Sequence, residues 1–480
     1  MRPFFICNKF FFNLDLINNI KFFVNSLFLE HNYIFSKSLF ISLVVILLIG
    51  FLLIFGRRLN FAIQLERYGL PIAVICGILG ILIGPYGIFH IFSKETTSVW
   101  AGSLTPLLAL VFGTLMLGRP VPNLKGLIKP ILNQFLLALS LGFGQFFIGG
   151  MVVKFILTPL MDVNPLMGCL IEVGFEGGHG AASIMGNSFN KLGFPEGLDL
   201  GLAMATMGLL SSSLIGSLFI FIGRLLKITN QEDEFKNQES SNLKLKFNIL
   251  EDLKILLTNI GLACLAIGIG VILVTFLRKI SIFFGDFSRE VIFSLPIFPL
   301  ILIGSLLVRY ILEKTGNTKF ISQILQREIA ILSTDLLIFT AMASLNLNTV
   351  LSNLTPILML TLFGLFWNIV CISLFAYFVF DEYWFEKGLV EFGNSTGVVA
   401  SGLLLLRLSD PKNKSRTLPI FTSKQLFAQL LLSGGFFTVL APFLLSMIGL
   451  LPWIEISAAF TFLSILIAIV INNKFSFSFS

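Results

Sequence analysis

Charged residues are scarce in this chain, and so are histidines and cysteines with metal-ligand spacing. Asp, Glu, Lys and Arg make up 12% of the 480 residues, whereas an ordinary soluble domain has roughly 25%. Only three histidines occur, and the five cysteines are scattered along the chain. The sequence contains no P-loop and no nucleotide-binding fingerprint. These absences argue against a metalloenzyme and against ATP-driven pumping, so we expect a protein that is not an enzyme and needs no cofactor.

Apolar residues are abundant instead, at 56% of the chain, and the mean hydropathy is +0.92. The apolar blocks reach about 20 residues, the length that a helix needs to cross about 30 Å of hydrocarbon. They lack the alternation of a membrane barrel strand. The net charge of +7 falls in loops between the blocks, so it indicates topology rather than binding to nucleic acid. The sequence predicts an all-α polytopic membrane protein.

The order of apolar and polar stretches divides the chain into two similar halves. Residues 1–37, in which charges interrupt every apolar run, form an N-terminal extension. A first repeat covers 38–226, a charged linker covers 227–254, and a second repeat covers 255–446. An extra C-terminal helix and tail occupy 447–480. Each repeat is expected to hold about five transmembrane helices and one glycine-broken, re-entrant hairpin, at 164–188 and at 388–408.

The predicted crossings have lengths suited to a bilayer. We place them at about 38–56, 70–92, 101–118, 131–158, 198–226, 256–277, 291–309, 328–345, 354–380, 425–446 and 452–472. An odd number of crossings in each half would invert the second repeat relative to the first, so that one hairpin enters from each side of the membrane. Lys and Arg in the short loops place the linker in the cytoplasm.

The first hairpin contains glycine, a carboxylate and an imidazole inside apolar sequence. Irregular backbone occurs at membrane depth only where it is buried in protein or lines a wet cavity. Gly177, Gly178 and Gly180 would let the chain turn and let a solute approach the backbone. His179 would donate to a carboxylate substrate, and Glu176 would bind a cation or carry a proton. The alternative is that the glycines only permit close helix packing and that His179 makes a structural hydrogen bond.

The second hairpin carries a dense set of oxygen ligands and hydrogen-bond donors, namely Glu391, Asn394, Ser395 and Thr396. We predict that Glu391 binds an ion and that the other three residues contact substrate. The alternative is a polar loop at the cytoplasmic face.

Two further polar residues stand within predicted helices. Asp335 lies in an apolar run and must turn inward, and Thr206 lies in a span expected to pack against the first hairpin. We predict both as ion-binding residues. Inverted halves with unwound segments in matching positions are typical of a secondary transporter that binds its solute near the middle of the membrane.

The first half also resembles a known family. Pro165-Leu166-Met167-Gly168, the block Gly177-Gly178-His179-Gly180, Ala203-Met204-Ala205-Thr206-Met207-Gly208-Leu209 and Leu214-Ile215-Gly216 are similar, in order and spacing, to the first signature region of the bacterial sodium/glutamate symporter family. The resemblance covers about residues 40–445 and is most specific between 165 and 216.

The resemblance implies a Na⁺-coupled carrier of an acidic amino acid in the bacterial inner membrane. It also implies two inverted repeats whose hairpins meet at the solute site, and an elevator-like shift of the hairpin-bearing part against a homodimeric scaffold. The chain departs from the family pattern where Glu176 and Asp335 replace small polar residues. It departs again where 394–397 replaces a stretch richer in Gly that includes Pro.

Three functions remain open at this point. The first is Na⁺-coupled symport of a glutamate-like acidic amino acid or small carboxylate. The second is cation/proton antiport through Glu176, Asp335 and Glu391, which the added acids favour because buried carboxylates repel an anionic substrate unless cations or protons neutralise them. The third, a membrane scaffold or receptor without transport, leaves the polar hairpins unexplained.

Overall fold

The computed structural model describes residues 72–87, 106–118, 127–228, 249–281, 297–410 and 414–472, with the single residues 283 and 292. The predicted extension 1–37, the span 38–56, most of the linker and the end of the tail lie outside the described residues. Within the described part, helix is the only regular structure. Seven helical stretches there are long and apolar enough to cross a membrane. The protein is therefore an all-helical, multi-pass membrane protein.

The two halves share an unusual order of elements. In the first half, α6 (Ile128–Val152) passes into a π-helical turn (Val153–Leu157) and the short α7 (Thr158–Met161). In the second half, α16 (Leu354–Val370) passes into a π-helical turn (Cys371–Phe375) and the short α17 (Ala376–Val379). π-Turns are rare and concentrate at functional sites. Finding one at the same place in each half shows that the two halves are built alike.

A segment that folds back on itself follows each of these helices. The first, named here hairpin 1, is residues 164–193 and holds a 3₁₀ turn (Pro165–Cys169), α8 (Leu170–Gly174) and α9 (Gly178–Lys191). The second, named hairpin 2, is α18 (Trp384–Ser409), whose helix is interrupted within its length.

Hairpin 1 begins and ends at the same place. Asn164 caps its first turn by accepting from the backbone N–H of Leu166 at 3.0 Å. The side-chain amide of Asn164 donates to the carbonyl of Gly193, beyond the end of α9, at 3.1 Å. The chain turns between the two arms at Gly178, whose φ of +64° lies in the left-handed region that glycine adopts without strain.

Hairpin 2 turns at Gly397 (φ −147°, ψ 34°) and Val398 (φ 72°, ψ 168°). A Cβ atom on Gly393 would lie 2.6 Å from the Cα of Gly402. In a straight helix, nine residues would separate these positions by about 13 Å. The two arms therefore run antiparallel and touch where neither glycine has a side chain.

The helices that follow the hairpins differ from each other. α10 (Gly197–Leu225) is continuous, whereas the predicted span 425–446 is wrong in its bounds and its continuity. Its helix begins at Thr417, ends as α19 at Leu431, and resumes as α20 (Phe436–Ile448). Ser433 and Gly434 between them have φ values of +57° and +86°, which no helix tolerates. The last helix, α21 (Leu450–Asn472), matches the predicted 452–472 closely.

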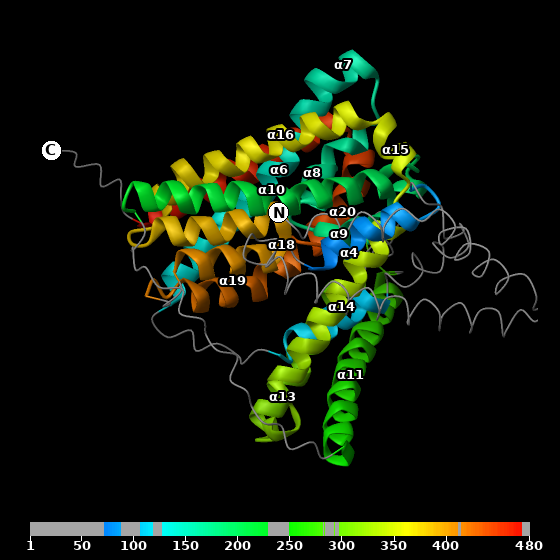
Figure 1. The fold of residues 1–480 in the computed structure, drawn as a ribbon, viewed down its shortest axis with the longest axis vertical. Coiled ribbons are helices and arrows are strands. Elements are labelled where there is room, and N and C mark those ends of the chain that lie inside the picture. The colour runs from blue at the N-terminus through cyan, green and yellow to red at the C-terminus, as the bar shows by residue number, and fades with distance from the viewer. Residues whose placement is uncertain are drawn as a thin grey trace, which may run out of the picture.

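Four helices form an arm beside the hairpin-bearing bundle. They are α4 (Ile72–Ile83), α11 (Ile249–Ser281), α13 (Phe298–Lys314) and α14 (Gln323–Ala343). Figure 1 shows α11 and α13 extending away from the bundle of α6, α10, α16 and α18. Gly270 and Gly304 let α11 and α13 approach closely, as small residues commonly do in membranes. A short helix, Pro106–Leu115, lies within the predicted span 101–118.

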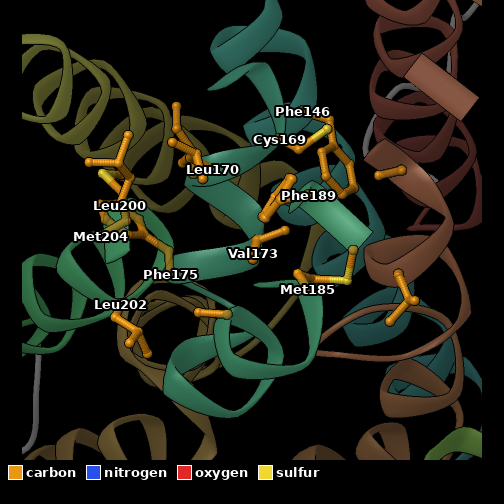
Figure 2. Packing of buried hydrophobic residues seen from close by; sticks show 14 of the residues in the cluster. Phe146, Cys169, Leu170, Val173, Phe175, Met185, Phe189, Leu200, Leu202 and Met204 are labelled. Carbon is orange, nitrogen blue, oxygen red and sulfur yellow. The ribbon is translucent and has the colours of Figure 1, made fainter. Parts of the chain in front are cut away.

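The largest apolar cluster surrounds hairpin 1. Figure 2 shows Val173 and Phe175 of its first arm together with Met185 and Phe189 of its second, beside Met204 of α10. All five side chains are completely buried. Lipid is as apolar as these residues, so close packing is what holds the hairpin in place. The apolar side chains of the hairpin are thus held by packing against the neighbouring helices. The ionisable groups near its turn are buried inside the bundle as well.

Candidate functional site

The turns of the two hairpins lie against each other. A Cβ atom on Gly178 would lie 2.4 Å from Cγ1 of Val398, which is the turn residue of hairpin 2. α10 passes close by, because a Cβ atom on Gly208 would lie 2.3 Å from the carbonyl oxygen of Thr396. The sequence elements that interrupt the two helices, more than 200 positions apart in the printed sequence, therefore meet in the middle of the bundle.

The first arm of hairpin 2 is tied to its neighbours by buried polar contacts. One carboxylate oxygen of Glu391 accepts from Lys424 Nζ of α19 at 2.9 Å, and the other accepts from the Gln134 amide of α6 at 2.8 Å. Gln425 donates to the amide oxygen of Asn394 at 2.6 Å. Glu391 and Lys424 are fully buried. Both oxygens of Glu391 are thus already occupied by groups of this chain.

Two further polar residues of hairpin 2 bind α6 and α16. Gln145 of α6 donates to the backbone carbonyl of Ser395 at 2.7 Å and to the side-chain oxygen of Asn368 at 3.1 Å. Asn368 of α16 donates in turn to the hydroxyl of Thr396 at 2.9 Å. The predicted substrate residues of hairpin 2 therefore lie buried in helix, just before the turn, and not in an exposed loop.

Several amide atoms of this network are buried yet have no hydrogen-bond partner in the described part of the chain. They are Gln134 Oε1, Gln145 Oε1, Asn394 Nδ2 and Gln425 Oε1. A buried polar atom without a partner costs about 1–3 kcal/mol, so this network holds several hydrogen-bonding groups that its own residues leave unmatched.

Hairpin 1 brings two glutamates together at the break between α19 and α20. Glu172 Oε1 accepts from the hydroxyl of Thr438 at 2.6 Å and from the backbone N–H of Ser433 at 3.3 Å. Glu176 Oε1 accepts from the hydroxyl of the same Ser433 at 3.0 Å. The two carboxylates are 0% and 2% exposed. They form a buried acidic pair that contacts one serine.

His179 makes a hydrogen bond inside the protein. Its Nε2 lies 3.1 Å from the hydroxyl of Thr206 on α10. Because that hydroxyl already donates to the carbonyl of Leu202 at 3.0 Å, its lone pair accepts the proton of Nε2. A Cβ atom on Gly180 would lie 2.9 Å from Leu108, so this glycine also serves close packing. Gly177 lies at the break itself.

Asp335 lies half-buried on α14, a helix that packs against α9 of hairpin 1. The hydrogen bonds of Glu172, Glu176 and Glu391, given above, go to other residues. The structure thus brings Glu176, His179 and Thr206 to hairpin 1 and Glu391, Asn394, Ser395 and Thr396 to hairpin 2, whereas Asp335 stands on the arm.

Sequence reasoning missed several residues of this network. Glu172 interrupts the apolar run Leu170–Gly174, and an ionisable residue in such a run is a functional candidate by default. Lys424 was missed because the predicted span began one residue after it. The buried amides Gln134, Gln145, Asn368 and Gln425 carry no pattern that separates them from polar residues on a lipid-facing helix.

A buried polar network held between broken helices is typical of an α-helical membrane transporter. A sequence model of the family described as sodium/glutamate symporter matches residues 36–384, well over half of the chain. The chain belongs to the sodium/glutamate symporter family, as its first-hairpin residues predicted. The matched range ends at the first residue of α18, so hairpin 2 lies almost wholly beyond it.

Among solved structures, the chain is similar to that of the sodium proton antiporter MjNhaP1 from Methanocaldococcus jannaschii at pH 8. The identity is 15% and the TM-score is 0.40, and the likeness covers 85% of this chain and 99% of the other. No match was found among curated proteins.

Proposed function

We propose that this protein is a secondary active transporter that couples the entry of Na⁺ to the uptake of a glutamate-like acidic amino acid or another small carboxylate. The observation that carries the proposal is the contact between the turns of the two hairpins, Gly178 against Val398, with buried polar side chains around it. Membrane transporters bind solute and ion at such a junction of broken helices.

The residues around the junction suit a carboxylate substrate. α9 begins at Gly178, and a helix N-terminus offers free N–H groups and about half a positive charge to an anion. Gly177, Gly178 and Gly180 have no side chain that would stand between a solute and the backbone once the hairpins part, and the imidazole of His179 lies in the same first turn of α9. Across the junction, Asn394, Ser395 and Thr396 would meet the other end of the solute, with the unpartnered amides beside them.

The charges near the junction require that cations accompany such a substrate. Three buried glutamates, Glu172, Glu176 and Glu391, are matched in their hydrogen bonds by one lysine, Lys424. Buried charge without a partner is costly, and an added anion would raise the cost further. Cations that enter with the anion remove it, which favours symport.

The same excess of buried acid also favours a second candidate, cation/proton antiport through Glu176, Asp335 and Glu391. In that case protons and metal cations would take turns on the carboxylates, and no organic solute would bind.

The membrane arrangement that we propose follows from the two hairpins. Each would enter and leave the bilayer on one side, within two inverted repeats, and the shared π-turns support the repeat. The hairpin-bearing bundle would shift, in an elevator-like movement, against the arm of α4, α11, α13 and α14. A homodimer and a bacterial inner-membrane location stay predictions.

Uptake of labelled glutamate into proteoliposomes tests the proposal directly. We expect uptake when Na⁺ is higher outside than inside and none when choline replaces Na⁺. Absence of uptake for any acidic amino acid or small dicarboxylate, together with proton release on addition of a metal cation, would replace symport by antiport.

A further inference from the structure

We propose that Glu172 and Glu176, with the hydroxyls of Ser433 and Thr438, form the site of the coupling cation, an alkali-metal ion the size of Na⁺. The site lies where hairpin 1 meets the break between α19 and α20. It deepens the proposed function and rests on it, because it assigns the ion of that transport cycle to particular residues and leaves Glu391 out.

The geometry gathers hard oxygen atoms in one place. Glu172 lies in α8, and Glu176 lies in the turn that follows the end of α8 at Gly174. Both touch Ser433, one through its backbone N–H and one through its hydroxyl. Thr438 binds Glu172 from the start of α20. Two carboxylates and two hydroxyls thus come from three separate elements.

Two of these carboxylate oxygens are evidence that a ligand binds here. The second carboxylate oxygen of each residue, Glu172 Oε2 and Glu176 Oε2, is buried and has no hydrogen-bond partner in the described part of the chain. A carboxylate oxygen is the strongest acceptor among side chains, and leaving one unmatched away from water is costly. A dehydrated cation bound at this acid pair would give these oxygens a partner.

The surrounding backbone also suits a cation. The site follows directly after the C-terminal end of α19, at Leu431, and a helix C-terminus carries about half a negative charge. Unwound backbone in a membrane-spanning segment is a recurrent source of carbonyl ligands for Na⁺. The break at 432–435 supplies such backbone, and its equivalent in the first half, α10, is continuous.

Glu391 is excluded as the exchangeable site by its partners. Its oxygens accept from Lys424 and Gln134, and Lys424 cannot leave because it is part of the chain. A metal cation would have to displace a lysine already paired at 2.9 Å. At Glu172 and Glu176 nothing comparable has to be displaced.

The test measures Na⁺ binding without substrate on the purified full-length protein in detergent. Thermal unfolding is followed as NaCl replaces choline chloride at constant ionic strength. A ligand that binds only the folded state raises Tm with its concentration. We expect Na⁺ to raise Tm in the unaltered protein, and Glu172→Gln and Glu176→Gln each to increase the NaCl required by about tenfold, or 1.4 kcal/mol. The control Glu455→Gln, at an exposed glutamate of α21, should respond as the unaltered protein does.

Two results would overturn the proposal: no response of the unaltered protein to Na⁺, or the same NaCl dependence in the double variant Glu172→Gln/Glu176→Gln. If the glutamine variants do not fold, Thr438→Val keeps both charges and removes one oxygen. A NaCl dependence unchanged in Thr438→Val would overturn the proposal as well, and a weaker one would support it.

The outcome also separates this proposal from the proposed function. If Na⁺-driven glutamate uptake persists in the double variant, the proposed cation site is wrong and the proposal of symport is retained. Na⁺ stabilisation that depends on both glutamates, without uptake of any acidic solute, sinks symport and leaves the cation site standing.

Discussion

Hairpin 1 and hairpin 2 have the same architecture but differ in how their buried acids are paired. Both follow a long helix with a π-turn, both fold back on themselves, and their turns touch at Gly178 and Val398. The acid of hairpin 2 has a lysine of the same chain as its partner. The two acids of hairpin 1 share Ser433, Thr438 binds one of them, and each keeps an oxygen with no partner among the described residues. At hairpin 2 the positive charge comes from Lys424 of the chain itself. At hairpin 1 we propose that it comes from a cation that can bind and dissociate.

This difference suggests that the two hairpins have different roles, one in stability and one in ion binding. A lysine of the same chain neutralises its acid without any bound ion, so the pair at Glu391 and Lys424 ties hairpin 2 to α19. The two acids of hairpin 1, whose hydrogen bonds go to Ser433 and Thr438 and not to a lysine, would change their energy when a cation arrives or departs. We therefore expect substitutions of Glu391 and Lys424 to act mainly on stability and those of Glu172 and Glu176 to act mainly on ion dependence.

Removing the fixed cation should give the largest effect. Lys424→Met leaves Glu391 buried and unpaired, and breaking a buried ion pair in this way costs about 3–5 kcal/mol of folding stability. The double variant Lys424→Met/Glu391→Gln removes both charges and should recover most of the loss. Thermal unfolding in detergent measures both. A Lys424→Met protein as stable as the original would show that the pair does not hold hairpin 2.

A methyl group placed between the turns of the two hairpins should give the second-largest effect, a loss of transport. Gly178→Ala adds a methyl group that would lie 2.4 Å from Val398, in a backbone conformation that costs an L-residue about 1–2 kcal/mol. Gly193→Ala is the matched control, since Gly193 also has positive φ (+83°) but open space around it.

In proteoliposome assays we expect Gly178→Ala to lose most of its uptake and Gly193→Ala to keep it. Equal losses in the two variants would mean that backbone strain, and not the contact between the hairpins, explains the effect.

Thr206→Val should have a moderate effect at hairpin 1. It removes the acceptor of His179 Nε2 and leaves a buried donor unmatched, at a cost of about 1–3 kcal/mol. Thr206→Ser keeps the hydroxyl and should restore both stability and the KM for substrate. If Thr206→Val changes KM without any loss of stability, His179 binds substrate and its bond to Thr206 is not structural.

The smallest effect should come from the base of hairpin 1. Asn164→Ala removes the bond to the carbonyl of Gly193 and the cap on Leu166, both near the surface, where such bonds contribute about 0.5–1.5 kcal/mol each. We expect a small fall in Tm and unchanged uptake. A large loss of uptake would mean that closure of the base, rather than packing of the arms, positions the turn.

The hairpins could be located from the sequence because their residues conflict with their surroundings. Glycine and ionisable residues inside apolar stretches predicted interruptions at 164–188 and 388–408, and the helices break inside both ranges, near Gly178 and at Gly397. The family could be predicted for the same reason, since the residues at 177–180 and 203–209 carry it. The match to residues 36–384 confirms the family and stops short of the predicted extent to 445.

The partners of the hairpins could not be read in the same way. Lys424 has an aliphatic stem that fits an apolar run, and only the contact with Glu391 shows that it is buried. Ser433 and Gly434 looked like ordinary small residues of a packed span, although Leu-Ser-Gly-Gly at 432–435 is also a typical helix breaker. Pairing between elements hundreds of residues apart leaves no local pattern.

The central claim, that the two hairpins meet turn to turn, is tested most directly by a disulfide. A Cβ atom on Gly178 would lie 3.9 Å from the Cβ of Val398, within the range that a disulfide requires. The five native cysteines are first replaced by serine or alanine, a protease site is placed in the linker 227–254, and Gly178→Cys/Val398→Cys is oxidised in membranes.

We predict that the two halves stay joined after cleavage until reductant is added, and that the control pair Gly193→Cys/Val398→Cys, with one cysteine at the base of hairpin 1, separates. Separation of the halves in the Gly178→Cys/Val398→Cys protein, with both cysteines open to a thiol reagent, would contradict the claim.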